Sequence, residues 1–174
     1  MRNHFLFFGI KTEERKTIFK TICKENQVEI SENSRAIALA LYSKPQRKLQ
    51  YCGIEILIKQ LKAYYKKEDV QLIEKLILTN SWWDSVDTIA KYILGEYLYE
   101  FPSVIEAVIE RFSNAENIWL NRSAILFQLG CREKTNFDLL KSAFEKHKNS
   151  TKFFIQKAIG WGLREYAKTN PKAV

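Results

Sequence analysis

Cysteine, proline and glycine are scarce in this chain, and their scarcity limits the structures it can form. The 174 residues include 3 cysteines, 3 prolines and 6 glycines. The cysteines are odd in number, lie far apart and form no CxxC pair, so no disulfide framework is indicated. Few prolines and glycines leave long stretches that can form helices. We therefore expect a helical protein of a reducing, cytoplasmic compartment.

The sequence also lacks a long apolar run and the common motifs of metal and nucleotide sites. No span of about 20 apolar residues occurs, so no membrane-spanning helix is expected. The apolar run in MRNHFLFFGI is too short for a signal peptide. His4 and His147 have no ligand-type neighbour at helical spacing, and neither a P-loop nor a nucleophile elbow is present. We expect no membrane partner, no metal and no other cofactor.

Positive charge is in excess. The chain has 28 Lys and Arg against 20 Asp and Glu, a formal net charge of +8, and a pI near 9.3. This balance favours a polyanionic partner, either nucleic acid or an anionic membrane surface. Apolar residues make up 46%, which suits one folded domain with a sizeable core. We expect a monomer.

Amphipathic helices account for most of the sequence. Thr12 can cap a helix that runs to about Asn26, and Ser31 or Asn33 can start a second that ends near Ser43. Further helices are expected to start near Pro45, Glu68, Ser81, Pro102, Asn117, Thr135 and Thr151. No segment alternates cleanly enough to form a strand. The sequence therefore predicts an all-α fold.

The expected helix starts recur with a regular spacing. Separations of 36, 36 and 34 residues join Pro45, Ser81, Asn117 and Thr151. A period near 35 with two helices in each period is typical of an α-solenoid. In this register Arg122 and Lys157 occupy equivalent places on one surface, which is usually the concave one. An irregular helical bundle with coincidental spacing is the alternative.

The segment SWWDSVD places two tryptophans beside two aspartates. Ser81 and Asp84 have the spacing of a capping box, which gives Asp84 a structural role. Asp87 lies four residues after Trp83, so both project from one helix face. Asp87 is either an exposed aspartate beside a half-buried indole or a carboxylate held against an aromatic wall. Trp82 lies on another face and is expected in the core.

The segment FFIQKAIGWGLREYAKTNP carries three cations and an indole along one helical stripe. Its members, at i, i+4, i+7 and i+11, are Lys157, Trp161, Arg164 and Lys168. This combination suits a surface that meets sugar and phosphate, although a solvated face with one partly buried tryptophan has the same pattern. Gly160 and Gly162 each cost the helix ~1 kcal/mol relative to alanine. Either close packing or close approach of a partner would account for them.

Four segments together resemble a known family. FLFFGIKTEERK, SWWDSVD, IWLNRSAILFQLG and FFIQKAIGWGLREYAKTNP occur in the order found in the AlkD-type DNA alkylation repair glycosylases. The resemblance runs from about Asn3 to Pro171. It implies HEAT-like helical repeats with a concave basic face that binds double-stranded DNA. It also implies excision of cationic N3- or N7-alkylated purines without a cofactor.

The resemblance assigns roles to particular residues. It implies that Asp87 is the catalytic carboxylate and that Trp83 and Trp161 are aromatic walls around the sugar of the lesion. It implies that Arg122 and Arg164 contact the DNA backbone, and the stripe adds Lys157 and Lys168 as phosphate contacts. Residues 1–174 are expected to form a single helical-repeat domain that begins and ends inside the span of the family. The alternative is a non-catalytic helical-repeat module that binds nucleic acid or protein.

Overall fold

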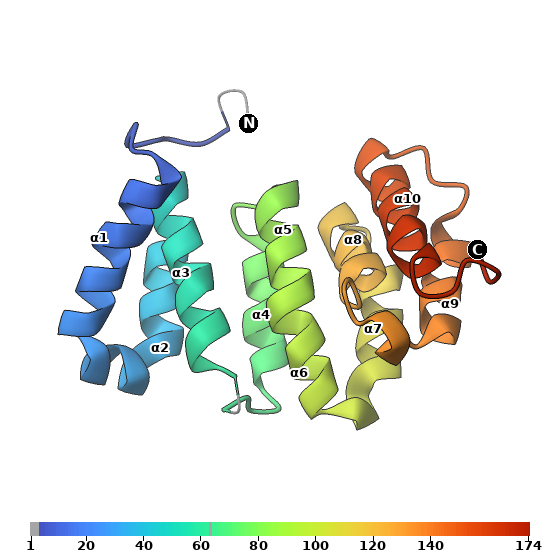
Figure 1. Ribbon diagram of the computed structural model, residues 1–174, viewed down its shortest axis with the longest axis horizontal. Coiled ribbons are helices and arrows are strands. Elements are labelled where there is room, and N and C mark those ends of the chain that lie inside the picture. Colours follow the sequence, from blue (N-terminus) through green and yellow to red (C-terminus); the bar gives the residue numbers. More distant parts are fainter. Residues whose placement is uncertain (1–3, 63) are drawn as a thin grey trace. The chain divides into compact units, whose positions relative to one another are not determined.

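The structure is a computed structural model that describes residues 4–62 and 64–174. Helices make up most of this part of the chain (Figure 1), and its only strand-like feature is an isolated bridge between Leu6 and Gln46. The predicted all-α fold is confirmed. None of the described helices is both long and apolar enough to cross a membrane. The chain divides into two compact units, residues 1–64 and 65–174.

The described residues of the first unit form three helices, α1 (Thr12–Glu25), α2 (Gln27–Tyr42) and α3 (Arg47–Gln60). The second helix begins earlier than predicted, at Gln27, and Asn33 interrupts it with a non-helical conformation (φ −118°, ψ 22°). Polar residues around this kink gave the false start in the sequence. The buried Arg15 joins α1 to α3, because its guanidinium donates hydrogen bonds to Glu55 Oε1 and Cys52 Sγ.

The second unit holds the remaining helices, which pair in succession. They are α4 (Asp69–Leu78), α5 (Trp83–Ile89), η1 (Ala90–Leu94), α6 (Gly95–Glu100), η2 (Pro102–Val104), α7 (Ile105–Asn114), α8 (Ile118–Leu126), η3 (Arg132–Lys134), α9 (Phe137–His147) and α10 (Phe153–Ala167). The segment η1 is a π-helix that continues α5 into α6 without a break.

Helices of the second unit stack as repeats. α4 packs on α5, α7 on α8 and α9 on α10, and α8 also contacts both α5 and α10. Figure 1 shows α5, α8 and α10 following one another along this unit. They begin at Trp83, Ile118 and Phe153, so each start lies 35 residues after the one before. The predicted period is therefore a structural repeat, and it brings the starts of these three helices to one end of the stack.

Two helix starts differ from the caps that the sequence suggests. The predicted cap Thr12 is wrong, since Thr12 is the first residue of α1, Lys11 is the N-cap residue and no side chain caps this helix. A helix start was predicted near Asn117, and Asn117 is the N-cap of α8, because its side chain accepts a hydrogen bond of 2.9 Å from the amide of Trp119. The capping box at Ser81 and Asp84 is wrong, since α5 has no side-chain cap and Trp82 is its N-cap residue. The hydroxyl of Ser81 donates instead to the carbonyl oxygen of Ile77, at 2.6 Å. Because the joint between α4 and α5 is short, the hydroxyl of Ser81 reaches the last turn of α4 and does not cap α5.

A compact apolar cluster fixes α10 to the rest of the second unit. Its buried members include Ile125, Phe144 and Ala158, and Trp161 packs against it. A Cβ atom at Gly162 would lie 2.9 Å from Cζ of Phe144, which is closer than packed atoms approach. Close packing of α10 on α9 therefore explains Gly162.

Candidate functional site

A buried ion pair joins α5 to α8 in the second unit. The Nε of Arg122 donates to Oδ1 of Asp87 at 2.7 Å, and its Nη2 donates to Oδ2 at 2.9 Å. The two residues are 4% and 7% exposed. A two-pronged pair of this kind fixes the orientation of the carboxylate as well as its position.

The surroundings of Asp87 set its acidity. Burial raises the pKa of Asp87, the hydrogen bonds and charge of Arg122 oppose that change, and the charge of Asp84 adds to it. The net pKa lies above the ordinary value of 3.8. A carboxylate removed from water interacts more strongly with a nearby positive charge than one in solvent does. The arrangement therefore suits Asp87 to stabilise a cation that forms next to it.

Arg122 also connects the ion pair to α10. Its Nη1 donates to the backbone carbonyl oxygen of Phe154 in the first turn of α10. The ring of Phe154 lies 5.0 Å from that of Trp119 and 5.6 Å from that of Trp82, measured between centroids. Three aromatic side chains thus meet beside the ion pair: one comes from α8, one from α10 and one from the residue before α5. Trp82 packs against these rings but is only half-buried, so it lies at the edge of the core that the sequence predicts for it.

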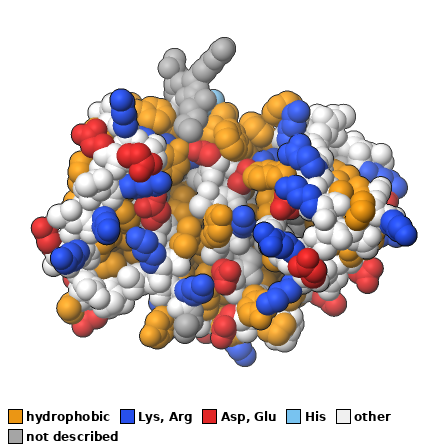
Figure 2. Space-filling view, in the orientation of Figure 1, with side chains coloured by type: hydrophobic (Ala, Val, Ile, Leu, Met, Phe, Trp, Pro, Cys, Tyr) orange, Lys and Arg blue, Asp and Glu red, His pale blue; other side chains and the backbone are white. Residues whose placement is uncertain are grey.

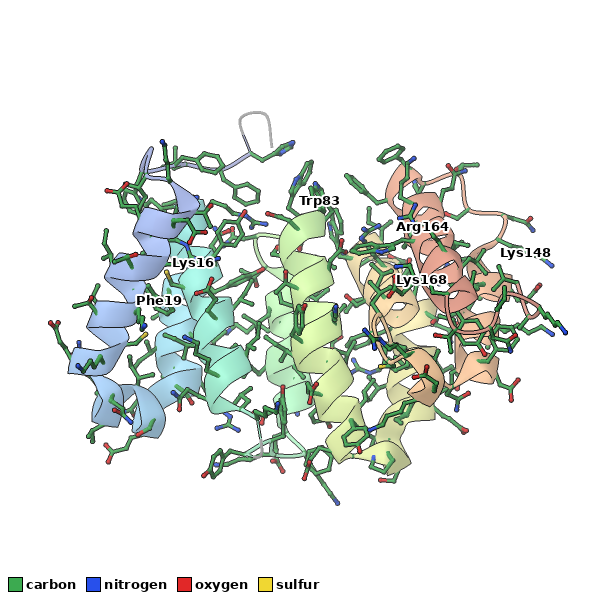
Figure 3. All side chains as sticks on the ribbon, viewed as in Figure 1. Lys16, Phe19, Trp83, Lys148, Arg164 and Lys168 are labelled. Carbon is green, nitrogen blue, oxygen red and sulfur yellow. The ribbon has the colours of Figure 1, made fainter. Side chains whose placement is uncertain are left out.

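The two tryptophans expected to form walls have different environments. Trp83 is the first residue of α5 and is 43% exposed, and Figure 3 shows it at the N-terminal end of that helix. Trp161 is half-buried and packs against the apolar cluster beneath α10. Most of the Trp83 side chain that α5 leaves uncovered is therefore in contact with solvent, whereas Trp161 is only partly accessible.

The predicted cationic stripe lies on the exposed side of α10. Lys157, Arg164 and Lys168 are all exposed, and the ammonium of Lys157 lies 5.4 Å from the ring centroid of Phe153. Lys168 donates to Glu165 at 2.6 Å, so part of its charge is already balanced. Figure 2 shows Lys and Arg side chains gathered over α10 and the neighbouring part of α8, and Figure 3 labels Arg164 and Lys168 on this face.

Arg122 and Lys157 do not share one environment, although the repeat register makes them equivalent. Arg122 is buried and makes three hydrogen bonds within the protein, whereas Lys157 is exposed. A signal for this difference was present in the sequence, because an apolar run at 124–127 begins two residues after Arg122, and its residues are buried. The contact of Arg122 with DNA remains a prediction, and its observed contacts indicate a role in holding Asp87.

In the described ranges, no group of three or more His, Cys, Asp or Glu side chains is placed to hold an ion. The three cysteines are free thiols. Among the acidic side chains that the structure describes, Asp87 is one that lies against a cation next to the aromatic cluster.

Comparisons with known proteins agree on one family. A family model described as DNA alkylation repair enzyme matches residues 1–174. A solved structure described as a predicted DNA alkylation repair enzyme from Enterococcus faecalis is 36% identical in sequence and has a TM-score of 0.87. The match covers 99% of this chain and 80% of that chain. A comparison with curated proteins gave no match.

Proposed function

Because the chain belongs to the DNA alkylation repair enzyme family, we propose that it is a DNA glycosylase that removes cationic N3- or N7-alkylated purines. The buried Asp87–Arg122 pair beside the aromatic cluster is the observation that carries this proposal. The reaction is hydrolysis of the N-glycosidic bond. Its products are the free base and an abasic site.

The substrate supplies much of the driving force for bond cleavage. Alkylation at N3 or N7 gives the purine a positive charge, so the base leaves readily and needs little acid catalysis. As the glycosidic bond breaks, positive charge develops on the sugar, as in other reactions with an oxocarbenium-like transition state. The catalytic task is therefore to stabilise that cation and to place a water molecule.

Asp87 performs both parts of this task in the proposed mechanism. An ionised carboxylate aimed at the anomeric carbon stabilises the sugar cation and accepts a hydrogen bond from the attacking water. Arg122 keeps the carboxylate ionised and fixes its direction through two hydrogen bonds. Each carboxylate oxygen retains a further acceptor site, so the pair does not exhaust the carboxylate.

The remaining residues bind the substrate. Trp83 and Trp161 flank the sugar of the lesion and exclude water, which strengthens the interaction between Asp87 and the sugar cation. Arg164, Lys157 and Lys168 contact phosphates and give affinity without reading the base sequence. Recognition through sugar and phosphate needs no tight pocket for the base.

The test is release of N7-methylguanine from a methylated duplex by the protein and by Asp87→Asn. We expect Asp87→Asn to bind the duplex about as well as the parent and to lose roughly 10²–10³-fold in excision rate. Asp84→Asn is the matched control, because Asp84 lies one turn earlier in the same helix and is half-buried. Equal excision by parent and Asp87→Asn would remove Asp87 from the mechanism. Binding without any base release by the parent would leave a non-catalytic DNA-binding module.

A further inference from the structure

Gly160 is a glycine in the middle of a helix with no structural reason in the described protein. It lies within α10, far from both helix ends, and its φ is not in the left-handed region. A Cβ atom built at Gly160 would have no heavy atom within 4 Å apart from its own helix. Neither close packing nor backbone conformation therefore explains it, in contrast to Gly162 two residues later.

Gly160 is placed within the cationic stripe. Lys157 lies three residues before it and Arg164 four residues after it, so both neighbour it on the helix surface. The two cations are about 10 Å apart along the helix axis, with Gly160 between them. Trp161 follows directly. The exposed side of α10 thus has bare backbone between two positive charges and next to the half-buried indole.

We propose that Gly160 is the point at which the sugar-phosphate backbone of duplex DNA comes closest to α10. This inference rests on the proposed function, since it assumes that the stripe binds DNA. The missing side chain lets a deoxyribose or phosphate contact the helix surface, while Lys157 and Arg164 neutralise the phosphates on either side. The helix accepts a residue that weakens it because a larger one would hold the DNA away from Trp161.

Substitution of Gly160 by alanine, leucine or lysine distinguishes close approach of DNA from simple exposure of the glycine to solvent. Gly160→Ala should raise the melting temperature by roughly 2–4 °C, because alanine favours the helix and meets nothing. The same change should weaken binding to a methylated duplex. Gly160→Leu should weaken it further, by roughly tenfold, which is the scale that overpacking sets.

Gly160→Lys gives the sharpest result. A lysine adds a positive charge to a DNA-binding surface and should tighten binding if DNA stays distant. If DNA approaches closely, the side chain should instead weaken binding despite its charge. Gln156→Lys is the matched control, because Gln156 is exposed on α10 one turn earlier and the substitution adds the same charge. We expect Gln156→Lys to bind as well as the parent or better, and Gly160→Lys to bind less well.

The outcomes distinguish the two proposals. Tighter binding by Gly160→Lys, together with unchanged binding by Gly160→Leu, would overturn the role of Gly160 even if the parent binds and excises normally. Failure of the parent itself to bind duplex DNA would overturn both. Weaker binding by all three variants with intact melting curves supports close approach at Gly160.

Discussion

The positive charge of Arg122 is balanced inside the protein by the carboxylate of Asp87. Arg122 is 4% exposed, and its side chain donates hydrogen bonds to Asp87 and to the carbonyl oxygen of Phe154. Removing one partner of a buried pair leaves the other charge without compensation, and this costs about 3–5 kcal/mol. Replacing both partners with apolar groups costs much less. The pair therefore contributes to stability through the coupling of its two members.

Arg122→Met should lower the free energy of unfolding by about 3–5 kcal/mol, because Asp87 is then buried alone. The double substitution Asp87→Leu with Arg122→Met should recover most of that loss. Urea unfolding of the parent, both single variants and the double variant measures the coupling. Additive losses in the double variant would show that the two side chains act independently.

The pH dependence of excision should report the ionisation of Asp87. Only the ionised carboxylate stabilises the sugar cation, so activity falls as pH falls through the pKa of Asp87. Since burial raises that pKa above 3.8, the acid limb should lie above the pH expected for an ordinary aspartate.

Arg122→Gln removes the interaction that lowers the pKa of Asp87, so the acid limb should move to still higher pH. Excision rates measured from pH 4 upward, at a temperature where both proteins are folded, test this. An acid limb at the same pH in both proteins would contradict a link between Arg122 and the ionisation of Asp87.

Arg164→Ala should weaken binding to DNA and reduce the slope of log K against log salt by about 1. Lys148→Ala is a charge-matched control, because Lys148 lies just after α9, pairs with Glu145 at 2.7 Å and is placed apart from Arg164 in Figure 3. The control should change the slope little. Equal effects of the two substitutions would mean that net charge, and not the position of Arg164, determines binding.

The sequence predicts which residues share a face of a helix, but it does not predict how deeply each of them is buried. The four-residue spacing correctly places Trp83 and Asp87 on α5, yet Trp83 is 43% exposed and Asp87 only 7%. The difference arises because α8 covers Asp87 and brings Arg122 to it. A partner that lies 35 residues away in sequence and comes from another helix leaves no local pattern.

At the scale of helices, the sequence predicts which helices form and in what order better than it predicts the residues at which they begin and end. The predicted helix start at Asn117 agrees with the structure, where its side chain accepts a hydrogen bond from an amide two residues on in the same helix. The predicted cap at Ser81 does not, because its hydroxyl bonds backwards to Ile77 in the preceding helix. A polar residue in a short joint can serve either neighbour, and only the three-dimensional path of the chain decides between them.

Gly162→Ala tests how α10 is held against α9. The new methyl group would lie 2.9 Å from Cζ of Phe144, so the ring or the helix must shift. Overpacking of this kind costs about 1–3 kcal/mol and outweighs the gain in helix propensity of ~1 kcal/mol. We expect a lower melting temperature than for the parent, opposite in sign to Gly160→Ala. A rise in melting temperature would show that the packing at Phe144 adapts freely.

For the whole molecule, the repeat period and the family resemblance agree with the observed helical repeats. The period was visible because residues that favour helix starts recur at a regular spacing, at Pro45, Ser81, Asn117 and Thr151. Which side of the repeats binds DNA stays a prediction. The cations of α10 and the net charge of +8 support an electrostatic mode of binding.

The intact protein should bind duplex DNA with an affinity that falls steeply as salt rises. Each phosphate neutralised contributes about 0.9 to the slope of log K against log salt, so contacts by Arg164, Lys157 and Lys168 predict a slope of roughly −2 to −3. Titrations with methylated and unmethylated duplexes at several salt concentrations measure it. Affinity that does not change with salt would favour a protein scaffold over a DNA repair enzyme.

The four tryptophans fall into two pairs with different optical properties. Trp82 and Trp119 have ring centroids 6.2 Å apart, close enough for their electronic transitions to couple. Trp83 and Trp161 lie in the part of the unit that the proposal assigns to DNA. Circular dichroism of the coupled pair therefore reports whether the repeats remain stacked, while fluorescence quenching of the other pair reports substrate. One unlabelled sample can follow folding and binding through separate signals.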